Sequence, residues 1–430
     1  MIDKTETGTI DKKQQPLKRG AGTLLPVASL PSKYGIGTFG KAAFDFIDFL
    51  RDSKQKYWQV LPVGPTGYGD SPYQSFSAFA GNPYFIDLEI LIEEGLIERE
   101  DADSVNWGDS PACIDYEKIY KERFAVLRKA FSNSSHMKDQ KYTDFCEKNS
   151  FWLGDYSLYM AVKEHFGGIE WLRWPDDIRL RKPEAVEAYA DKLKQDVQFW
   201  SFTQYKFTEQ LQELRRYAHE NSVEIIGDIP IYVAMDSADT WVNTQQFQMD
   251  EDHRPLLVAG VPPDMFSKTG QLWGNPLYDW DYMKKDNFSW WRERMRYSAT
   301  LYDIIRIDHF IGIVNYYAID AEAETAMEGK WNKGPGAELL NAINEEIGDT
   351  LIIAEDLGVV TKEVTRVLEM SGYPGMKLMQ FGFDANPRNS NIPRHFSSNC
   401  VVYGGTHDNE TLRGYFENAG SQIRANARKA

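Results

Sequence analysis

Four carboxylates that follow apolar stretches are the residues of this sequence best placed to do chemistry. One stretch, 301–307, runs through Arg306 and stops at Asp308. Such stretches are typical of strands buried on both faces of a parallel sheet. Ligands bind at the carboxyl ends of such strands, so the four carboxylates are predicted to converge in one pocket. They are Asp228, Asp308, Glu355 and Asp408.

Carboxylates that share a pocket can divide the work of an acid and a base. Mutual repulsion separates their pKa values, so that one keeps its proton while a neighbour is ionised. Glycosidic-bond chemistry needs this division, because an acid protonates the leaving oxygen while a carboxylate acts at the sugar carbon. A structural ion pair between Arg306 and Asp308 is the simpler alternative, but the recurrence of the pattern favours catalysis.

Several motifs of the chain resemble those of the amylomaltases, also called 4-α-glucanotransferases or disproportionating enzymes, which are relatives of the α-amylases. They include IRIDHFIG (305–312), IIAEDLG (352–358) and YGGTHDNET (403–411). The resemblance runs from about residue 18 to the C-terminus. It implies an α/β fold, a (β/α)₈ TIM-type barrel with helical insertions. It also implies a retaining 4-α-glucanotransferase, which moves α-1,4-glucan segments between maltooligosaccharides through a covalent glycosyl-enzyme intermediate.

The resemblance also implies roles for individual residues. Asp308 would be the nucleophile, Glu355 the general acid/base, and Asp408 the third carboxylate, which holds sugar hydroxyls in the transition state. Arg306 would keep Asp308 ionised, as an adjacent cation does. Further contacts with substrate are expected from Asp70, Ser71, Tyr73, Asp228, Asp264, Phe266, Trp273, Arg306 and His407.

The loops that carry these contacts also have simpler explanations. The stretch rich in Gly, Pro and Tyr after 56–63 could be only a turn-rich connection. The segment 250–282 could be a packed connection or a lid that excludes water, and the family resemblance favours the lid. His407 could be a structural histidine. The family usually has Tyr where this chain has Met265, so one acceptor-side stacking contact is expected to differ.

The order of the expected elements predicts one barrel with insertions. Residues 1–18 are expected to be a disordered leader and residues 19–430 the catalytic barrel. The stretch 86–200 has no obvious buried strand and is predicted to be an inserted helical subdomain, whose tryptophans are core residues. Strands are expected at 22–27, 56–63, 224–233, 301–308, 351–356, 377–383 and 400–408. An eighth strand is not found before the sequence stops, so the barrel is predicted to be truncated before its last strand.

Composition and spacing argue against several other classes of protein. A net charge of −16 disfavours nucleic acid or an anionic membrane surface as a partner, and no apolar run approaches a membrane span. Three scattered cysteines are typical of a reducing cytoplasm and form no metal spacing. The string GIGTFG (35–40) matches a dinucleotide fingerprint, but it does not follow its strand directly. The Asn-His pair that α-amylases carry near a calcium site is absent after Asp228, so no metal or cofactor is expected.

The expected partners are an α-1,4-glucan donor and a sugar acceptor, which would be a maltooligosaccharide or glucose. Two alternatives use the same residues. A hydrolase or phosphorylase of the same superfamily would pass the intermediate to water or phosphate. A glucan-binding fragment without turnover would only bind the sugar.

Overall fold

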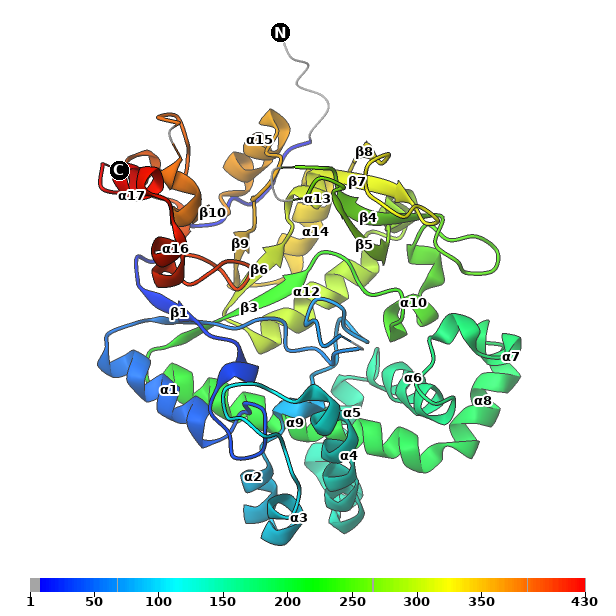
Figure 1. Cartoon of the computed structure of the whole chain (residues 1–430). Coiled ribbons are helices and arrows are strands. Elements are labelled where there is room, and N and C mark those ends of the chain that lie inside the picture. Colours follow the sequence, from blue (N-terminus) through cyan, green and yellow to red (C-terminus); the bar gives the residue numbers. More distant parts are fainter. Residues whose placement is uncertain (1–7, 68, 265–266, 385, 430) are drawn as a thin grey trace.

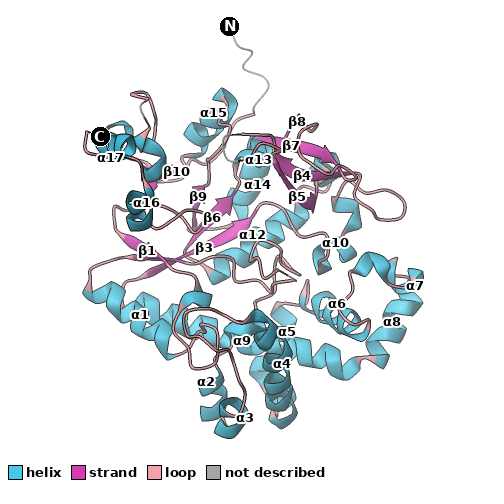
Figure 2. Cartoon of the chain, in the orientation of Figure 1, coloured by secondary structure: helices cyan, strands magenta, loops and turns pink. Residues whose placement is uncertain are grey.

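The computed structural model describes residues 8–67, 69–264, 267–384 and 386–429, and its centre is a curved parallel sheet (Figures 1 and 2). The sheet has seven strands in the order β1-β2-β3-β6-β9-β10-β11, all paired in parallel. This is the strand order of a (β/α) barrel. The strands are β1 (Gly22–Leu24), β2 (Tyr57–Gln59), β3 (Glu224–Pro230), β6 (Ile304–Asp308), β9 (Leu351–Ala354), β10 (Gly375–Leu378) and β11 (Cys400–Tyr403).

The central strands are apolar because both of their faces are covered. Ile304, Ile305 and Ile307 of β6 are all at most 2% exposed. Their alternation places successive side chains on the barrel interior and against the outer helices. Curvature of the sheet brings distant strands together, since the Tyr403 hydroxyl of β11 donates a 2.6 Å hydrogen bond to the Gln59 amide oxygen of β2.

Helices connect the strands and cover the outside of the sheet, as an alternation of strands and helices requires (Figure 2). Those between successive barrel strands are α1 (Lys41–Asp52), α9 (Lys194–Glu220), α12 (Ser289–Leu301), α14 (Ala337–Glu346) and α15 (Lys362–Ser371). Shorter helices of the second half are α10 (Ala238–Val242), α11 (Trp280–Lys285), α13 (Ile311–Val314), α16 (Leu412–Asn418) and α17 (Ser421–Ala427).

The stretch 86–200 is helical, as the sequence predicts, and it lies beside the barrel (Figure 1). Its tryptophans are buried, and they share one hydrophobic core with the barrel strands. They are therefore packing residues, as expected. The tryptophans are Trp107, Trp152, Trp171, Trp174 and Trp200. The helices are α2 (Leu88–Glu93), α3 (Arg99–Asp103), α4 (Tyr116–Asn133), α5 (Gln140–Lys148), α6 (Leu153–His165), α7 (Asp176–Arg179) and α8 (Pro183–Lys192).

The segment 250–282 differs from the loop that the sequence predicts, because it contains β4 (Leu257–Val261) and β5 (Gln271–Pro276). These pair in an antiparallel sheet of order β5-β4-β7-β8, with β7 (Asn315–Asp320) and β8 (Lys330–Lys333). Gly, Pro and polar residues interrupt the apolar pattern of these strands and hide it in the sequence. Besides β5, β4 pairs with β7, which lies more than 50 residues later, and local patterns do not reveal that partner.

Two further expectations differ from the structure. The predicted strand 377–383 is wrong over most of its length, since β10 ends at Leu378 and residues Met379–Phe383 form a 3₁₀ helix. Residues 8–18 of the predicted leader form no helix or strand, yet they are fastened to the barrel. The Gln14 side chain exchanges hydrogen bonds of 2.7 and 2.9 Å with the backbone of Ile352. The Gln14 N–H donates to the Ser371 carbonyl at 2.8 Å.

Candidate active site

A buried arginine joins two of the predicted carboxylates at the carboxyl ends of β3 and β6. One Arg306 nitrogen lies 2.6 and 2.7 Å from the two Asp228 oxygens and 3.0 Å from an Asp308 oxygen. Arg306 is 3% exposed and Asp228 is 1% exposed. A buried charge must be paired, so this contact holds both strand ends in one arrangement. The structure therefore brings Asp228, Arg306 and Asp308 together, as the sequence predicts.

Glu355 belongs to the same group through the neighbouring strand. Ile307 of β6 pairs with Ala354 of β9, so Asp308 and Glu355 follow matched positions on adjacent parallel strands. The Glu355 carboxylate accepts hydrogen bonds from the backbone N–H groups of His309, at 2.7 Å, and Leu357, at 2.9 Å. These two donors orient a carboxylate that is only 7% exposed.

One cation faces three carboxylates here, and this imbalance decides where a proton resides. Burial raises the pKa of Asp308 to about 8. The Arg306 charge opposes the rise, and the charges of Asp228 and Glu355 add to it. Burial also raises the pKa of Glu355, although Arg306 and the two backbone donors counteract it. Arg306 therefore favours the ionised form of Asp308, as an adjacent cation does, while burial favours the protonated form. The group keeps a proton near neutral pH.

Tyr73 reaches the group from the loop after β2. Its hydroxyl donates to Asp228 at 2.8 Å and lies 3.0 Å from His407 Nε2. The rings of Tyr73 and His407 stack with centroids 5.4 Å apart. Burial and the nearby charges of Asp228 and Asp308 raise the pKa of Tyr73, so it stays a hydroxyl donor. The structure thus places Tyr73 and His407 beside the carboxylate group.

Ser71 and Asp70, which were also predicted to contact substrate, lie at the margin of the site. The Ser71 hydroxyl accepts a hydrogen bond from the Tyr73 N–H at 3.3 Å, so it shapes the turn that presents the tyrosine. Asp70 has a positive φ of 54°. Its charge contributes to raising the pKa of Tyr84, which directly precedes the helical insertion, and of Tyr116 in α4. Asp70 therefore lies toward the helical insertion.

Asp408 is placed differently from the other three carboxylates. Its side chain is 75% exposed, and its ion-pair contact is with His407 at 3.3 Å. The turn that carries it is held by Asn409, whose side-chain oxygen accepts hydrogen bonds from the Thr406 N–H and hydroxyl at 3.1 Å. Three of the four predicted carboxylates therefore converge. The fourth, Asp408, lies at the rim of the site beside His407.

The antiparallel sheet contributes one aromatic wall. The ring of Trp273, on β5, lies edge-on to the His309 ring at 4.8 Å, and Tyr232 lies near both. Asp264 is exposed and accepts a hydrogen bond from the Ser267 N–H at 2.8 Å. The predicted contact Phe266 lies outside the described residues, as does Met265, where the family usually has Tyr.

His309 and Tyr232 were not among the predicted site residues. His309 has a φ of 49°, in the left-handed region, and this conformation turns its N–H toward Glu355. Burial lowers the pKa of His309 to about 4, so its imidazole is neutral. Its position directly after Asp308 was the available signal. Tyr232 carried no comparable signal, since it reads as one more apolar residue after β3.

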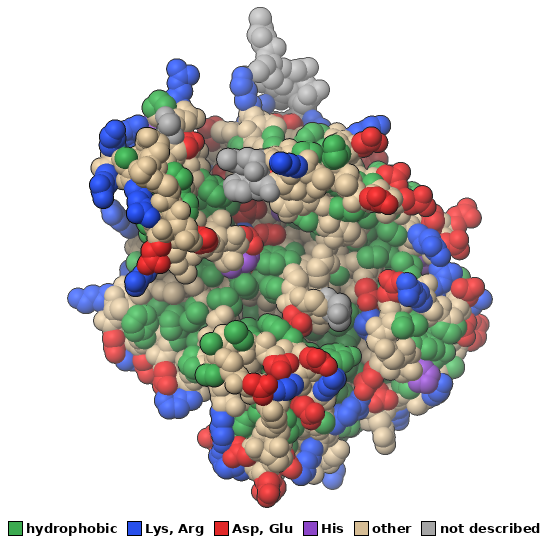
Figure 3. Space-filling view, viewed as in Figure 1, with side chains coloured by type: hydrophobic (Ala, Val, Ile, Leu, Met, Phe, Trp, Pro, Cys, Tyr) green, Lys and Arg blue, Asp and Glu red, His purple; other side chains and the backbone are tan. Residues whose placement is uncertain are grey.

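The face of the molecule drawn in Figure 3 differs between its middle and its rim. Figure 3 shows that hydrophobic side chains gather in the middle of this face, whereas Lys, Arg, Asp and Glu lie mostly toward its rim.

Among the described residues, no group of three or more His, Cys, Asp and Glu side chains could hold a metal ion. In the same part of the chain, no helix is long and apolar enough to cross a membrane.

A curved parallel sheet with carboxylates paired at the ends of adjacent strands defines a barrel enzyme that acts on glycosidic bonds. The comparisons with known proteins make this assignment narrower. A family model described as 4-alpha-glucanotransferase matches residues 25–430. The chain belongs to this family.

Similar proteins cover nearly all of the chain. A 4-alpha-glucanotransferase of Clostridium butyricum is 52% identical over 397 residues, which is 92% of this chain and 82% of that protein. One from Thermus thermophilus is 45% identical, over 94% of this chain and 81% of that protein. The solved structure of an amylomaltase from Streptococcus agalactiae in complex with acarbose superposes with a TM-score of 0.92 at 43% identity. It covers 96% of this chain and 84% of that one.

Proposed function

We infer that this protein is a retaining 4-α-glucanotransferase, which moves α-1,4-glucan segments from one maltooligosaccharide to another. Family membership gives the reaction class. The observation that carries the mechanism is the placement of Asp308 and Glu355 at matched positions on adjacent parallel strands. Neighbouring strands lie about 4.7–4.9 Å apart, which suits the carboxyl separation of about 5–5.5 Å that retaining enzymes use.

In the first half of the reaction, the two carboxyls need different protonation states. Glu355 donates a proton to the leaving glycosidic oxygen while Asp308 attacks the sugar carbon, and a glycosyl ester of Asp308 forms. The shared proton must then reside on Glu355 and not on Asp308. A glucan oxygen near Glu355 and contact of Asp308 with the sugar carbon favour this distribution.

In the second half, Glu355 removes a proton from the 4-hydroxyl of the acceptor sugar, and this oxygen displaces Asp308. The anomeric carbon of the transferred sugar keeps its α configuration because it is inverted twice in sequence. Asp228 and Arg306 fix the position of Asp308 throughout the reaction. The hydrogen bond to Asp228 fixes the position of Tyr73. Asp408 and His407 supply hydrogen bonds to sugar hydroxyls from the rim.

The rings of Trp273 and Tyr232 are suited to stack on sugar faces and to keep water from a position where it could attack the intermediate. We assign the same purpose to the segment that carries Asp264 and Phe266. The three cysteines are free thiols, which fits work in a reducing compartment such as the cytoplasm.

The test is incubation with maltotriose, followed by chromatography of the products and by measurement of reducing ends. A transferase gives a ladder of longer maltooligosaccharides plus glucose, with no gain in reducing ends. A steady rise in reducing ends would instead indicate a hydrolase, and sugar phosphate formed only with added phosphate would indicate a phosphorylase. Binding without products at high protein concentration would contradict the enzyme assignment.

A further inference from the structure

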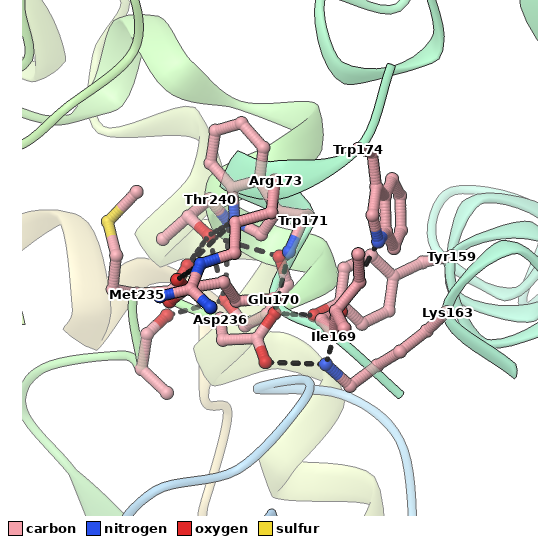
Figure 4. Close-up of polar contacts among 12 residues, drawn as sticks. Tyr159, Lys163, Ile169, Glu170, Trp171, Arg173, Trp174, Met235, Asp236 and Thr240 are labelled. Atoms are coloured by element: carbon pink, nitrogen blue, oxygen red, sulfur yellow. Dashed lines mark hydrogen bonds and ion pairs between the residues drawn. The ribbon is translucent and has the colours of Figure 1, made fainter. Parts of the chain in front are cut away.

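A polar cluster around Asp236 connects the helical insertion to the loops of the active site (Figure 4). Asp236 follows β3 and precedes α10. Its carboxylate accepts hydrogen bonds from the Tyr159 hydroxyl at 2.7 Å and the Trp171 N–H at 3.2 Å. The Lys163 ammonium lies 2.5 Å from its other oxygen. Tyr159 and Lys163 belong to α6, so three groups of the insertion meet on one carboxylate of the barrel.

Lys163 also contacts the loop that carries Tyr73. Its ammonium lies 5.0 Å from the centroid of the Phe76 ring, which is close enough for a cation–π interaction. The Phe76 carbonyl accepts a hydrogen bond from the Ala238 N–H at 2.8 Å. The Asp239 carboxylate accepts one from the Ala78 N–H at 2.7 Å. The loop after β2 and the segment after β3 are thus joined to each other and to α6.

The two joined segments present the aromatic groups of the site. Tyr73, three residues before Phe76, donates to Asp228. Tyr232, four residues before Asp236, has its ring 6.5 Å from that of His309 and 6.3 Å from that of Trp273. A displacement at Asp236 would therefore move groups on both sides of the sugar site.

We propose that the Lys163–Asp236 pair is a positioning device that sets the spacing between the Tyr73 loop and the Tyr232 segment, and that it thereby orients the acceptor sugar. Both are positioning residues, because they act through the segments they hold. The Lys163 side chain is 7% exposed and that of Asp236 is 31% exposed. An ion pair with a desolvated partner adds little stability compared with apolar packing, so its value lies in fixing one arrangement. The proposal rests on the transferase function inferred above.

The chain offers a matched control in Lys206 of α9. The side chains of Lys163 and Lys206 are each 7% exposed. Lys206 pairs with Glu94 at 2.7 Å and Glu209 at 2.7 Å, both on the helical side of the molecule. Replacing either lysine by methionine removes a buried cation of the same kind. Only the change at Lys163 disconnects the active-site loops from the insertion.

The experiment compares Lys163→Met, Asp236→Asn and Lys206→Met with the unaltered chain. Maltotriose kinetics are followed both by ladder formation and by release of reducing ends, and Tm is measured for each protein. Lys163→Met and Lys206→Met are expected to lower Tm alike. Only the changes at Lys163 and Asp236 should raise KM about five- to tenfold and increase the ratio of hydrolysis to transfer, with kcat within about threefold. Asp236→Glu should restore part of the KM.

A milder variant keeps the test decisive if the ion-pair variants do not fold. Tyr159→Phe removes one neutral hydrogen bond to Asp236 and should raise KM about twofold in the same direction. Equal KM changes in Lys163→Met and Lys206→Met would overturn the proposal, as would an unchanged KM and ratio in folded Asp236→Asn or Tyr159→Phe. Absence of a ladder from the unaltered chain would contradict the transferase function itself, so the two failures are distinguishable.

Discussion

The centre of the barrel and its β11 end present carboxylates in opposite settings. Asp228 and Glu355 are 1% and 7% exposed and have several donors each. The Asp408 side chain is 75% exposed, and its ion-pair contact within the described part of the chain is with His407 at 3.3 Å. Strands β6 and β9 have a paired neighbour on each side, whereas β11 is an edge of the described sheet. Strands that are paired on both sides therefore hold the carboxylates of the reaction centre in fixed positions. The exposed side chain of Asp408 at the rim is free to be oriented by a bound sugar.

The largest expected effect comes from removing the nucleophile at the centre. Asp308→Ala should lower both transfer and hydrolysis about 10⁴-fold or more, because no glycosyl ester can form. Asp408→Ala should lower them less, by about 10²- to 10³-fold, because hydrogen bonds to sugar hydroxyls assist the same step without forming a bond. Initial rates with maltotriose measure both. Equal losses in the two variants would remove the distinction between centre and rim.

The second-largest difference between the centre and the rim is expected in the free energy of unfolding. Asp228→Ala leaves the Arg306 charge buried with less compensation, and the free energy of unfolding should fall by about 3–5 kcal/mol. Asp408→Ala removes an exposed carboxylate and should change it by no more than about 0.5 kcal/mol. Denaturant titration of both proteins checks this. A change in Asp408→Ala as large as in Asp228→Ala would mean that the rim is also part of the folded framework.

The pH dependence of kcat/KM should report on the centre alone. Burial raises the pKa of Asp308 to about 8 and also raises that of Glu355, so the group keeps one proton up to that pH. Above about pH 8 the last proton is lost and none remains for the leaving oxygen. kcat/KM should then fall about tenfold per pH unit. Asp408→Asn should lower the whole profile without moving this limb, and a limb that moves would link the rim carboxylate to the shared proton.

The smallest effect is expected at the aromatic wall between the two regions. Trp273→Ala should raise the ratio of hydrolysis to transfer about threefold to tenfold, since water gains access while the acceptor loses a stacking surface. Formation of the glycosyl ester should change less. Reducing ends counted against the maltooligosaccharide ladder give the ratio. The conservative Trp273→Phe should lie between the two, and an unchanged ratio in Trp273→Ala would assign water exclusion to another group.

Local sequence was informative wherever a strand is buried on both faces. The runs before Asp228, Asp308 and Glu355 are apolar enough to be recognised without knowing their neighbours, and the three carboxylates do meet. The buried tryptophans of the helical insertion followed from the same reasoning. The antiparallel pair of β4 and β5 could not be recognised in this way, because Gly and Pro interrupt its pattern and the second partner of β4, strand β7, lies far along the chain.

By itself, the sequence determined the family and the fold class and indicated candidate residues for the chemistry, because apolar runs ending in carboxylates and the motifs around them are local properties. The protonation of the site was decided only by the tertiary structure. The pKa of Asp308 depends on how deeply it is buried and on three charges contributed by two other strands and its own. The contacts of Asp236 were also decided by the tertiary structure, because its partners on α6 are more than 70 residues away. Such contacts arise only when distant segments fold together, so no local pattern records them.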